Sequence, residues 1–259
     1  MSKTWVRYQK GSQQGFGTLV NETIHCMSGD MYGESEATGE TLLLNEVKLL
    51  APCQPTKIVA MWNNFHQLAE AQNLIPPEFP FYFIKPESCV SHHGAEIIHP
   101  EGYDGRLIYE GELGVVIGKT CKNVSREQAA DYVLGYTCIN DVTAIHLLFK
   151  YEAFPQWTRA KSFDSFGVIG PCIVELDDPD SLIVKTLVNG EERQNYPVAD
   201  MFFSPLELVS LISGDMTLQP GDVIACGTSL GVKTMKPNTT VEVVIDGVGT
   251  LTNTYKMDV

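Results

Sequence analysis

Short apolar runs bounded by turn residues follow one another along most of the 259-residue chain. Residues 81–84, 107–117, 132–139, 166–174 and 183–188 are rich in β-branched or aromatic side chains, which is typical of strands. The helical stretches between them are too few and too short to cover the crossovers of a parallel sheet. The pattern therefore predicts a β-rich α+β fold and disfavours a doubly wound α/β sheet.

The first part of the chain also alternates strand-like runs with turns. It ends at residues 51–55, where two prolines in five residues favour a linker or a sheet edge. We therefore expect a small N-terminal lobe over residues 1–50 and a larger domain over residues 51–259. Three short helices are predicted, at residues 64–72, 125–132 (with Ser125 as N-cap) and 205–212.

The charge balance of the chain limits the classes of partner that it can bind. The chain has 18 Lys and Arg against 32 Asp and Glu, a net charge of −14, and its basic residues do not cluster. This disfavours binding to nucleic acid or to an anionic membrane surface. The sequence shows neither a long apolar run typical of a membrane span nor the apolar stretch of a signal peptide, so we expect a cytoplasmic protein. An anionic substrate would need a bound metal or a few well-placed Lys and Arg.

Three acidic residues form the most informative pattern. Glu110 and Glu112 begin an apolar, strand-like run, and residues two apart in a strand project to the same face. A divalent cation would relieve the repulsion and the desolvation of such a pair, although an exposed pair on an edge strand also fits the spacing. Asp141 ends another apolar run and would complete an oxygen-only set that suits Mg²⁺ or Mn²⁺ better than zinc. Asn140 and Asp141 are equally compatible with a turn or a helix cap.

Four segments in a fixed order extend this pattern. They are EGELGVVIGK (110–119), GYTCINDVT (135–143), QWTRAKSFD (156–164) and QPGDVIACGT (219–228). Together they resemble the fumarylacetoacetate hydrolase superfamily, over a stretch from about Val47 to the end of the chain. Within it they resemble the branch of 2-hydroxyhepta-2,4-diene-1,7-dioate isomerases and 5-carboxymethyl-2-oxo-hex-3-ene-1,6-dioate decarboxylases.

The resemblance implies a flattened, mixed β-roll with short helices as the catalytic domain, preceded by a small N-terminal lobe, in a homodimer. It implies one Mg²⁺ or Mn²⁺ ion per subunit, and its metal ligands fall on Glu110, Glu112 and Asp141. The family lysine falls on Lys161, which would contact the substrate and add positive charge where negative charge develops. Thr228, with the backbone N–H groups around Gly227, would bind the substrate carboxylate.

A general base is also needed. His66 lies in a stretch similar to the short lid helix where the family carries a His–Glu pair, and Glu70 follows one helical turn later. At this spacing the carboxylate of Glu70 can orient the imidazole, although an exposed helix histidine fits the pattern equally well. The family spacing is more often three residues.

The segment after Asp141 departs from the family. Members often carry Arg, then Asp and Gln, on the following helix, whereas Ile145 and Leu148 stand at such positions here. The glutamine that orients water or an oxyanion in several members is therefore missing, unless His146 or Gln156 replaces it. This departure affects the choice of reaction more than it affects the metal site.

The sequence thus predicts a metal-dependent enzyme acting on a small 2-oxo or 2-hydroxy-unsaturated carboxylic acid. The reaction would be C–C cleavage, decarboxylation or keto–enol isomerisation through an enolate. The leading substrate is an unsaturated 2-hydroxy or 2-oxo dicarboxylate. An acylpyruvate hydrolase and an oxaloacetate decarboxylase or tautomerase are the alternatives, and a non-catalytic metal-binding homologue is the rival from another class.

Overall fold

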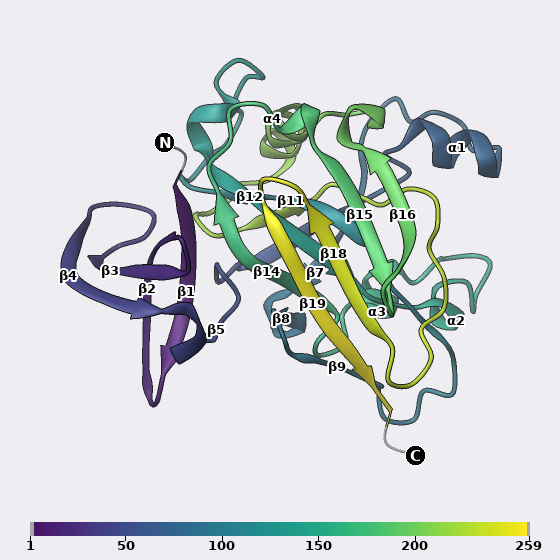
Figure 1. The fold of residues 1–259 in the computed structure, drawn as a ribbon. Helices are drawn as coiled ribbons and strands as arrows, with labels where there is room; N and C mark the ends of the chain where they lie inside the picture. The colour runs from purple at the N-terminus through teal and green to yellow at the C-terminus, as the bar shows by residue number, and fades with distance from the viewer. Residues whose placement is uncertain (1–2, 258–259) are drawn as a thin grey trace.

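The protein is built mainly of strands arranged in two large sheets, with short helices at the periphery (Figure 1). The computed structural model describes residues 3–257. The predicted β-rich α+β class is confirmed. Among the described residues, no helix is long and apolar enough to cross a membrane.

The larger sheet has twelve strands. Its main path runs through β4 (Ser35–Leu43), β3 (Thr23–Gly29), β2 (Gln13–Val20), β1 (Thr4–Lys10), β14 (Gly167–Val174), β12 (Val133–Asp141), β11 (Gly111–Ile117), β17 (Val223–Ala225), β6 (Lys57–Trp62) and β7 (Phe81–Pro86). Two short strands pair beside this path, β5 (Lys48–Leu49) with β1 and β8 (Val90–His92) with β14.

The second sheet has five strands, in the order β16 (Glu191–Pro197), β15 (Ile183–Val188), β18 (Thr240–Ile245), β19 (Gly249–Lys256) and β9 (Glu96–Ile98). A separate two-stranded ladder joins β10 (Leu107–Ile108) to β13 (Thr143–Ala144). The helices are α1 (His66–Gln72), α2 (Ile145–Leu148), α3 (Trp157–Lys161) and α4 (Pro205–Asp215).

The two sheets pack face to face, with β18 and β19 lying in front of β12 and β14 in Figure 1. The Tyr196 hydroxyl on β16 donates a hydrogen bond to the carbonyl of Gly111 on β11, which ties the layers together. Covered on both faces, β11 is buried along its entire length. Any acidic side chain on this strand must therefore be accommodated inside the protein.

The N-terminal strands β1 to β4 stand to one side in Figure 1 but extend the larger sheet. Strand β1 pairs antiparallel with β14, with Thr4 opposite Val174 and Trp5 opposite Ile173. The predicted boundary between residues 50 and 51 therefore divides two parts that are joined by backbone hydrogen bonds, and it stays a prediction.

One predicted helix is wrong. Residues 125–132 form turns and then a 3-10 helix from Ala129 to Tyr132, with no side-chain cap. The amides of Gln128 and Asp131 bond to carbonyls three residues back, at Ser125 and Gln128. This segment belongs to the connection from β11 to the adjacent antiparallel β12, and 3-10 turns are frequent in such connections.

Candidate active site

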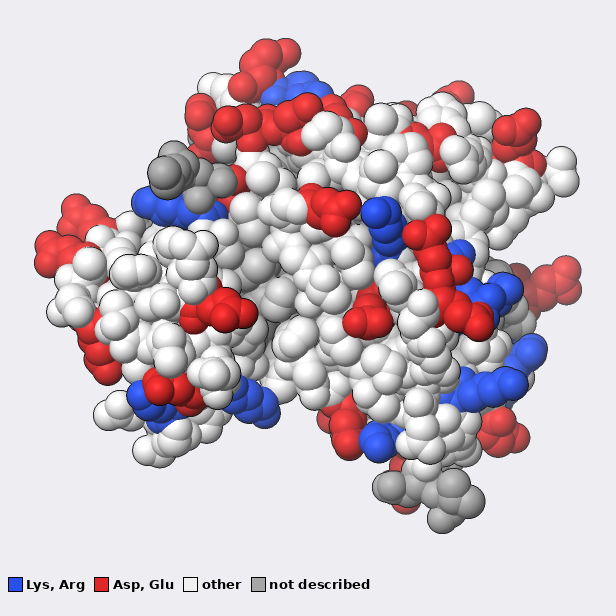
Figure 2. Space-filling view, in the orientation of Figure 1, with Lys and Arg blue, Asp and Glu red and all other residues white. Residues whose placement is uncertain are grey.

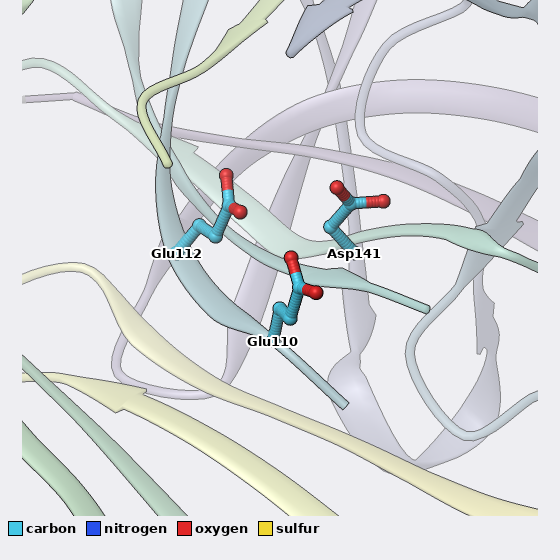
Figure 3. Close-up of side chains that lie close together, drawn as sticks. All are labelled: Glu110, Glu112 and Asp141. Carbon is cyan, nitrogen blue, oxygen red and sulfur yellow. The ribbon is translucent and has the colours of Figure 1, made fainter. Parts of the chain in front are cut away.

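The pairing of β11 with β12 brings three carboxylates together (Figure 3). Gly111 lies opposite Asn140, and the Asp141 amide donates to the Glu110 carbonyl at 2.8 Å. Glu110, Glu112 and Asp141 each offer one oxygen within 4.8 Å of the others. Figure 3 shows Glu112 on β11, Glu110 directly before this strand and Asp141 at the end of the neighbouring β12, all pointing to a common centre.

Two buried lysines accompany this cluster. The Lys161 ammonium, on α3, lies 2.6 Å from both Glu110 Oε2 and Asp141 Oδ2. Lys85, on β7, donates to Asp141 Oδ1 and, at 3.0 Å, to the carbonyl of Phe166. Both lysines are 1% exposed. The sequence pattern predicts a role for Lys161 but not for Lys85, whose only local signal is its inward position on β7, on the same face as Phe83.

These contacts shift the pKa values of Asp141 and Glu112 in opposite directions. Burial alone would raise the pKa of Asp141, but the ammonium groups of Lys161 and Lys85 outweigh it and lower that pKa. Burial, followed by repulsion from Asp141, raises the pKa of Glu112 well above its ordinary value. The carboxylates likewise outweigh burial at Lys161, whose pKa is raised. Lys161 is therefore a cation at neutral pH.

The donor set fits a divalent cation. Glu112 accepts a hydrogen bond from the Gly227 amide at 2.9 Å, but within residues 3–257 it has no ion pair with Lys or Arg. When all are ionised, the three carboxylates exceed the two ammonium groups by one negative charge. A cluster of buried carboxylate oxygens with excess negative charge suits a hard cation such as Mg²⁺ or Mn²⁺.

A cavity of about 390 Å³ opens above this cluster. Glu110, Lys161 and Thr228 line its polar end. The Thr228 hydroxyl donates to the Gly111 carbonyl at 3.0 Å and accepts from Gln194 Nε2 at 2.9 Å. Because the Gly227 amide is engaged by Glu112, only Thr228 of the predicted carboxylate-binding pair faces the cavity here.

Comparison with known proteins identifies the family. Residues 57–256 match the sequence model of the fumarylacetoacetate (FAA) hydrolase C-terminal domain, and residues 4–52 match an Rv2993c-like N-terminal model. The chain belongs to the fumarylacetoacetate hydrolase family. The predicted resemblance, including its isomerase and decarboxylase branch, is confirmed.

Three relatives illustrate the chemistry of the family. An oxaloacetate tautomerase of Bacillus subtilis is 39% identical over 224 residues, which cover 81% of this chain and 73% of the relative. The solved structure of 2-hydroxyhepta-2,4-diene-1,7-dioate isomerase from Mycobacterium marinum superposes with a TM-score of 0.89, at 34% identity and with 98% of each chain covered. A maleylpyruvate hydrolase from Sphingobium, solved with manganese(II) and pyruvate, gives a TM-score of 0.79 at 26% identity, again over 98% of each chain. The chain is accordingly an enzyme of the fumarylacetoacetate hydrolase family.

The predicted base does not reach the cluster in this structure. His66 and Glu70 are both exposed on α1, and the His66 ring lies against Phe202 with 4.0 Å between ring centroids. Leu68 and Gln72, not His66, line the cavity from this helix. A catalytic role for His66 would require α1 to move, and it stays a prediction.

The structure also locates the departures from the family after Asp141. Ile145 and Leu148, on α2, line the cavity and form part of its wall. His146 is exposed and accepts a hydrogen bond from Arg106, while the side-chain amide of Gln156 donates to the carbonyl of Phe154. Neither polar residue lines the cavity, so neither replaces the missing glutamine in this structure.

Proposed function

We propose that this enzyme catalyses a divalent-metal-dependent reaction of a small 2-oxo acid, or of its 2-hydroxy-unsaturated tautomer, through an enolate. The observation that carries the proposal is the buried cluster of Glu110, Glu112 and Asp141, which meets Lys161 at the end of a cavity. The Sphingobium relative, crystallised with manganese(II) and pyruvate, supports both the metal and the substrate class.

Glu110, Glu112 and Asp141 would hold one Mg²⁺ or Mn²⁺ ion per subunit. When bound, such an ion supplies Lewis-acid polarisation of a carbonyl group and stabilisation of developing negative charge. Both ions prefer oxygen ligands, so the donor set supports either.

Lys161 would act on the substrate directly. Its ammonium lies at the polar end of the cavity, already buried and held by two carboxylates. A preorganised charge in a site of low dielectric stabilises an oxyanion without the cost of reorienting solvent. Lys161 would thus donate a hydrogen bond to the substrate oxygen on which negative charge develops, and Lys85 would keep Asp141 ionised.

The remaining roles are assigned to groups around the cavity. We assign binding of the substrate carboxylate to Thr228 and Gly227, with Lys161 nearby. We assign proton transfer to His66, oriented by Glu70, after α1 moves toward the cavity. Proton transfer by a positioned side chain typically contributes a factor of about 10² to 10⁴ in rate.

Several overall reactions share this enolate. Our leading assignment is isomerisation or decarboxylation of an unsaturated dicarboxylate, in keeping with the Mycobacterium marinum isomerase. Tautomerisation of oxaloacetate is the second candidate, because a Bacillus subtilis oxaloacetate tautomerase is similar over most of this chain. Hydrolysis of an acylpyruvate is the third candidate.

The test follows pyruvate release and enol absorbance together for oxaloacetate and a panel of acylpyruvates. Each assay is run with Mg²⁺ or Mn²⁺ and repeated with EDTA. EDTA-sensitive pyruvate release indicates a lyase or hydrolase, and EDTA-sensitive enol decay without pyruvate indicates a tautomerase or isomerase. Turnover that EDTA leaves unchanged contradicts the metal assignment.

Two further assignments rest on the resemblance to the family. We propose that the enzyme is a homodimer, which light scattering coupled to gel filtration tests directly, and that it acts in the cytoplasm. On the face shown in Figure 2, Lys and Arg lie singly or in small groups among Asp and Glu, which is in keeping with a small-molecule substrate and not a nucleic acid.

A further inference from the structure

The cavity has a charged end and an apolar remainder. Lys161 is the only Lys, Arg or His side chain among the described residues that line it. The cavity lining also includes the apolar side chains of Trp62, Trp157, Ile145 and Leu148. A substrate whose carboxylate and 2-oxo group occupy the polar end must therefore place its other end against apolar side chains.

The aromatic part of this wall is preorganised. The rings of Trp62 and Trp157 lie 5.5 Å apart between centroids, and Trp157 stacks on Phe83 at 5.6 Å. Phe149 meets Trp157 edge-on at 6.3 Å and is 64% exposed. Packed aromatic rings present a large apolar surface whose side chains have little freedom left to lose on binding.

Asn63, a neutral polar residue of the wall, does not offset the lack of a second cation. Asn63 is 4% exposed, and its amide nitrogen donates to the carbonyl of Ile75 at 3.1 Å. Its Oδ1 is buried, has no hydrogen-bond partner and belongs to a residue of the cavity wall. An acceptor oxygen without a donor repels a carboxylate, whereas buried charge needs a paired cation.

The net charge of the cluster also disfavours a second carboxylate on the substrate. With all five groups ionised, as metal binding requires of the ligands, three carboxylates and two ammonium groups leave one negative charge, and a divalent ion would turn this into one positive charge. A single substrate carboxylate then neutralises the site. A second carboxylate at the apolar end would remain unpaired.

We infer that the enzyme selects 2-oxo acids whose far substituent is apolar and uncharged, and that Ile145, Leu148 and Trp157 determine this specificity. The inference rests on the proposed function, because it takes the 2-oxo acid end of the substrate as given. It keeps the proposed 2-oxo acid chemistry but favours a monocarboxylate over both dicarboxylate candidates named above. It also gives Ile145 and Leu148, where the family often has polar residues, a role in substrate choice.

The test compares two ligands of equal length, 2-oxohexanoate and 2-oxohexanedioate. The far end is a methyl group in the first and a carboxylate in the second. Isothermal titration calorimetry measures their binding to the Mn²⁺-loaded protein, so that no turnover is needed. We expect 2-oxohexanoate to bind at least about 10-fold more tightly, since an unpaired charge in an apolar pocket is strongly disfavoured.

Ile145→Arg should change this ratio. Ile145 is only half-buried at the start of α2, so the longer side chain can be accommodated, and its guanidinium supplies the missing cation. We expect the affinity ratio to shift by at least about 10-fold toward 2-oxohexanedioate. Ile98→Arg is the matched control, because Ile98 is 58% exposed on β9 and does not line the cavity, and it should keep the wild-type ratio.

The possible results test the specificity inference and the proposed function separately. Equal affinities, or tighter binding of 2-oxohexanedioate by the wild-type protein, contradict the specificity inference alone. Binding of neither ligand to protein that demonstrably holds Mn²⁺ contradicts the proposed function as well. If Ile145→Arg folds and leaves the ratio unchanged, Ile145 does not determine specificity. The wild-type comparison stands by itself should that variant fail to fold.

Discussion

The two ends of the cavity are built in different ways. At the polar end Glu112 and Asp141 lie on or beside long paired strands, and Lys85 and Lys161 are 1% exposed. At the apolar end the wall comes from Trp62 at the end of β6, from the short helices α2 and α3, and from Phe149, which is 64% exposed. Strand pairing fixes Glu112, Asp141 and Lys85, while the four-residue helix α2 at the rim can vary in sequence without disturbing them. The difference indicates that the polar end determines the type of reaction and the rim determines the substrate.

Glu112→Gln should have the largest effect on function, because it changes the carboxylate cluster at the polar end of the cavity. It removes one of the three proposed metal ligands, so we expect at least about a 100-fold loss of Mn²⁺ affinity and loss of metal-dependent turnover. The fold should survive, because a buried neutral amide avoids the desolvation of a carboxylate. Calorimetry with Mn²⁺ and circular dichroism check the two points, and turnover at the wild-type rate would remove Glu112 from the metal site.

Lys85→Met should destabilise the polar end without touching the rim. Asp141 would lose one of its two buried cationic partners, and we expect unfolding to become easier by about 3 kcal/mol. Lys48→Met makes the same change at an exposed position and should shift stability by less than about 0.5 kcal/mol. Urea denaturation measures both, and equal values for the two variants would contradict the role given to Lys85.

His66→Ala tests whether the rim contributes to catalysis. If α1 brings His66 to the substrate, kcat should fall by about 100-fold while Mn²⁺ affinity stays unchanged. Gln67→Ala is the neighbouring control on the same exposed turn and should keep the wild-type rate. An undiminished kcat in His66→Ala would assign the proton transfer to another group.

The smallest predicted effect is a pH dependence of the metal-free protein. The folded state raises the pKa of Glu112, mainly by burial, so it binds the proton more tightly than the unfolded chain does. The resulting contribution to stability is present below the unfolded pKa of about 4.3 and is lost as pH rises through the raised value. In EDTA, Glu112→Gln should therefore gain stability relative to wild type between pH 4 and pH 8, by about 1 kcal/mol or more. Urea denaturation at several pH values measures the difference, and a constant difference would contradict the raised pKa.

The sequence predicted much of the polar end because its signals are local. Glu110 and Glu112 share a strand face by their spacing, and Asp141 ends a neighbouring apolar run, as the structure confirms. The contact of Lys85 with Asp141 could not be predicted, because the two residues are 56 positions apart in the sequence and no local pattern indicates such a contact. The apolar wall could not be predicted either, because Trp62, Ile145 and Trp157 are distant in the sequence and line one cavity only in the folded chain.

The most direct test of the central claim is a crystal structure of the protein soaked with Mn²⁺, measured for anomalous scattering. The account predicts one strong anomalous peak among the carboxylates of Glu110, Glu112 and Asp141, with oxygens from all three as ligands. A peak elsewhere, or an empty cluster in protein that calorimetry shows to bind Mn²⁺, would contradict it.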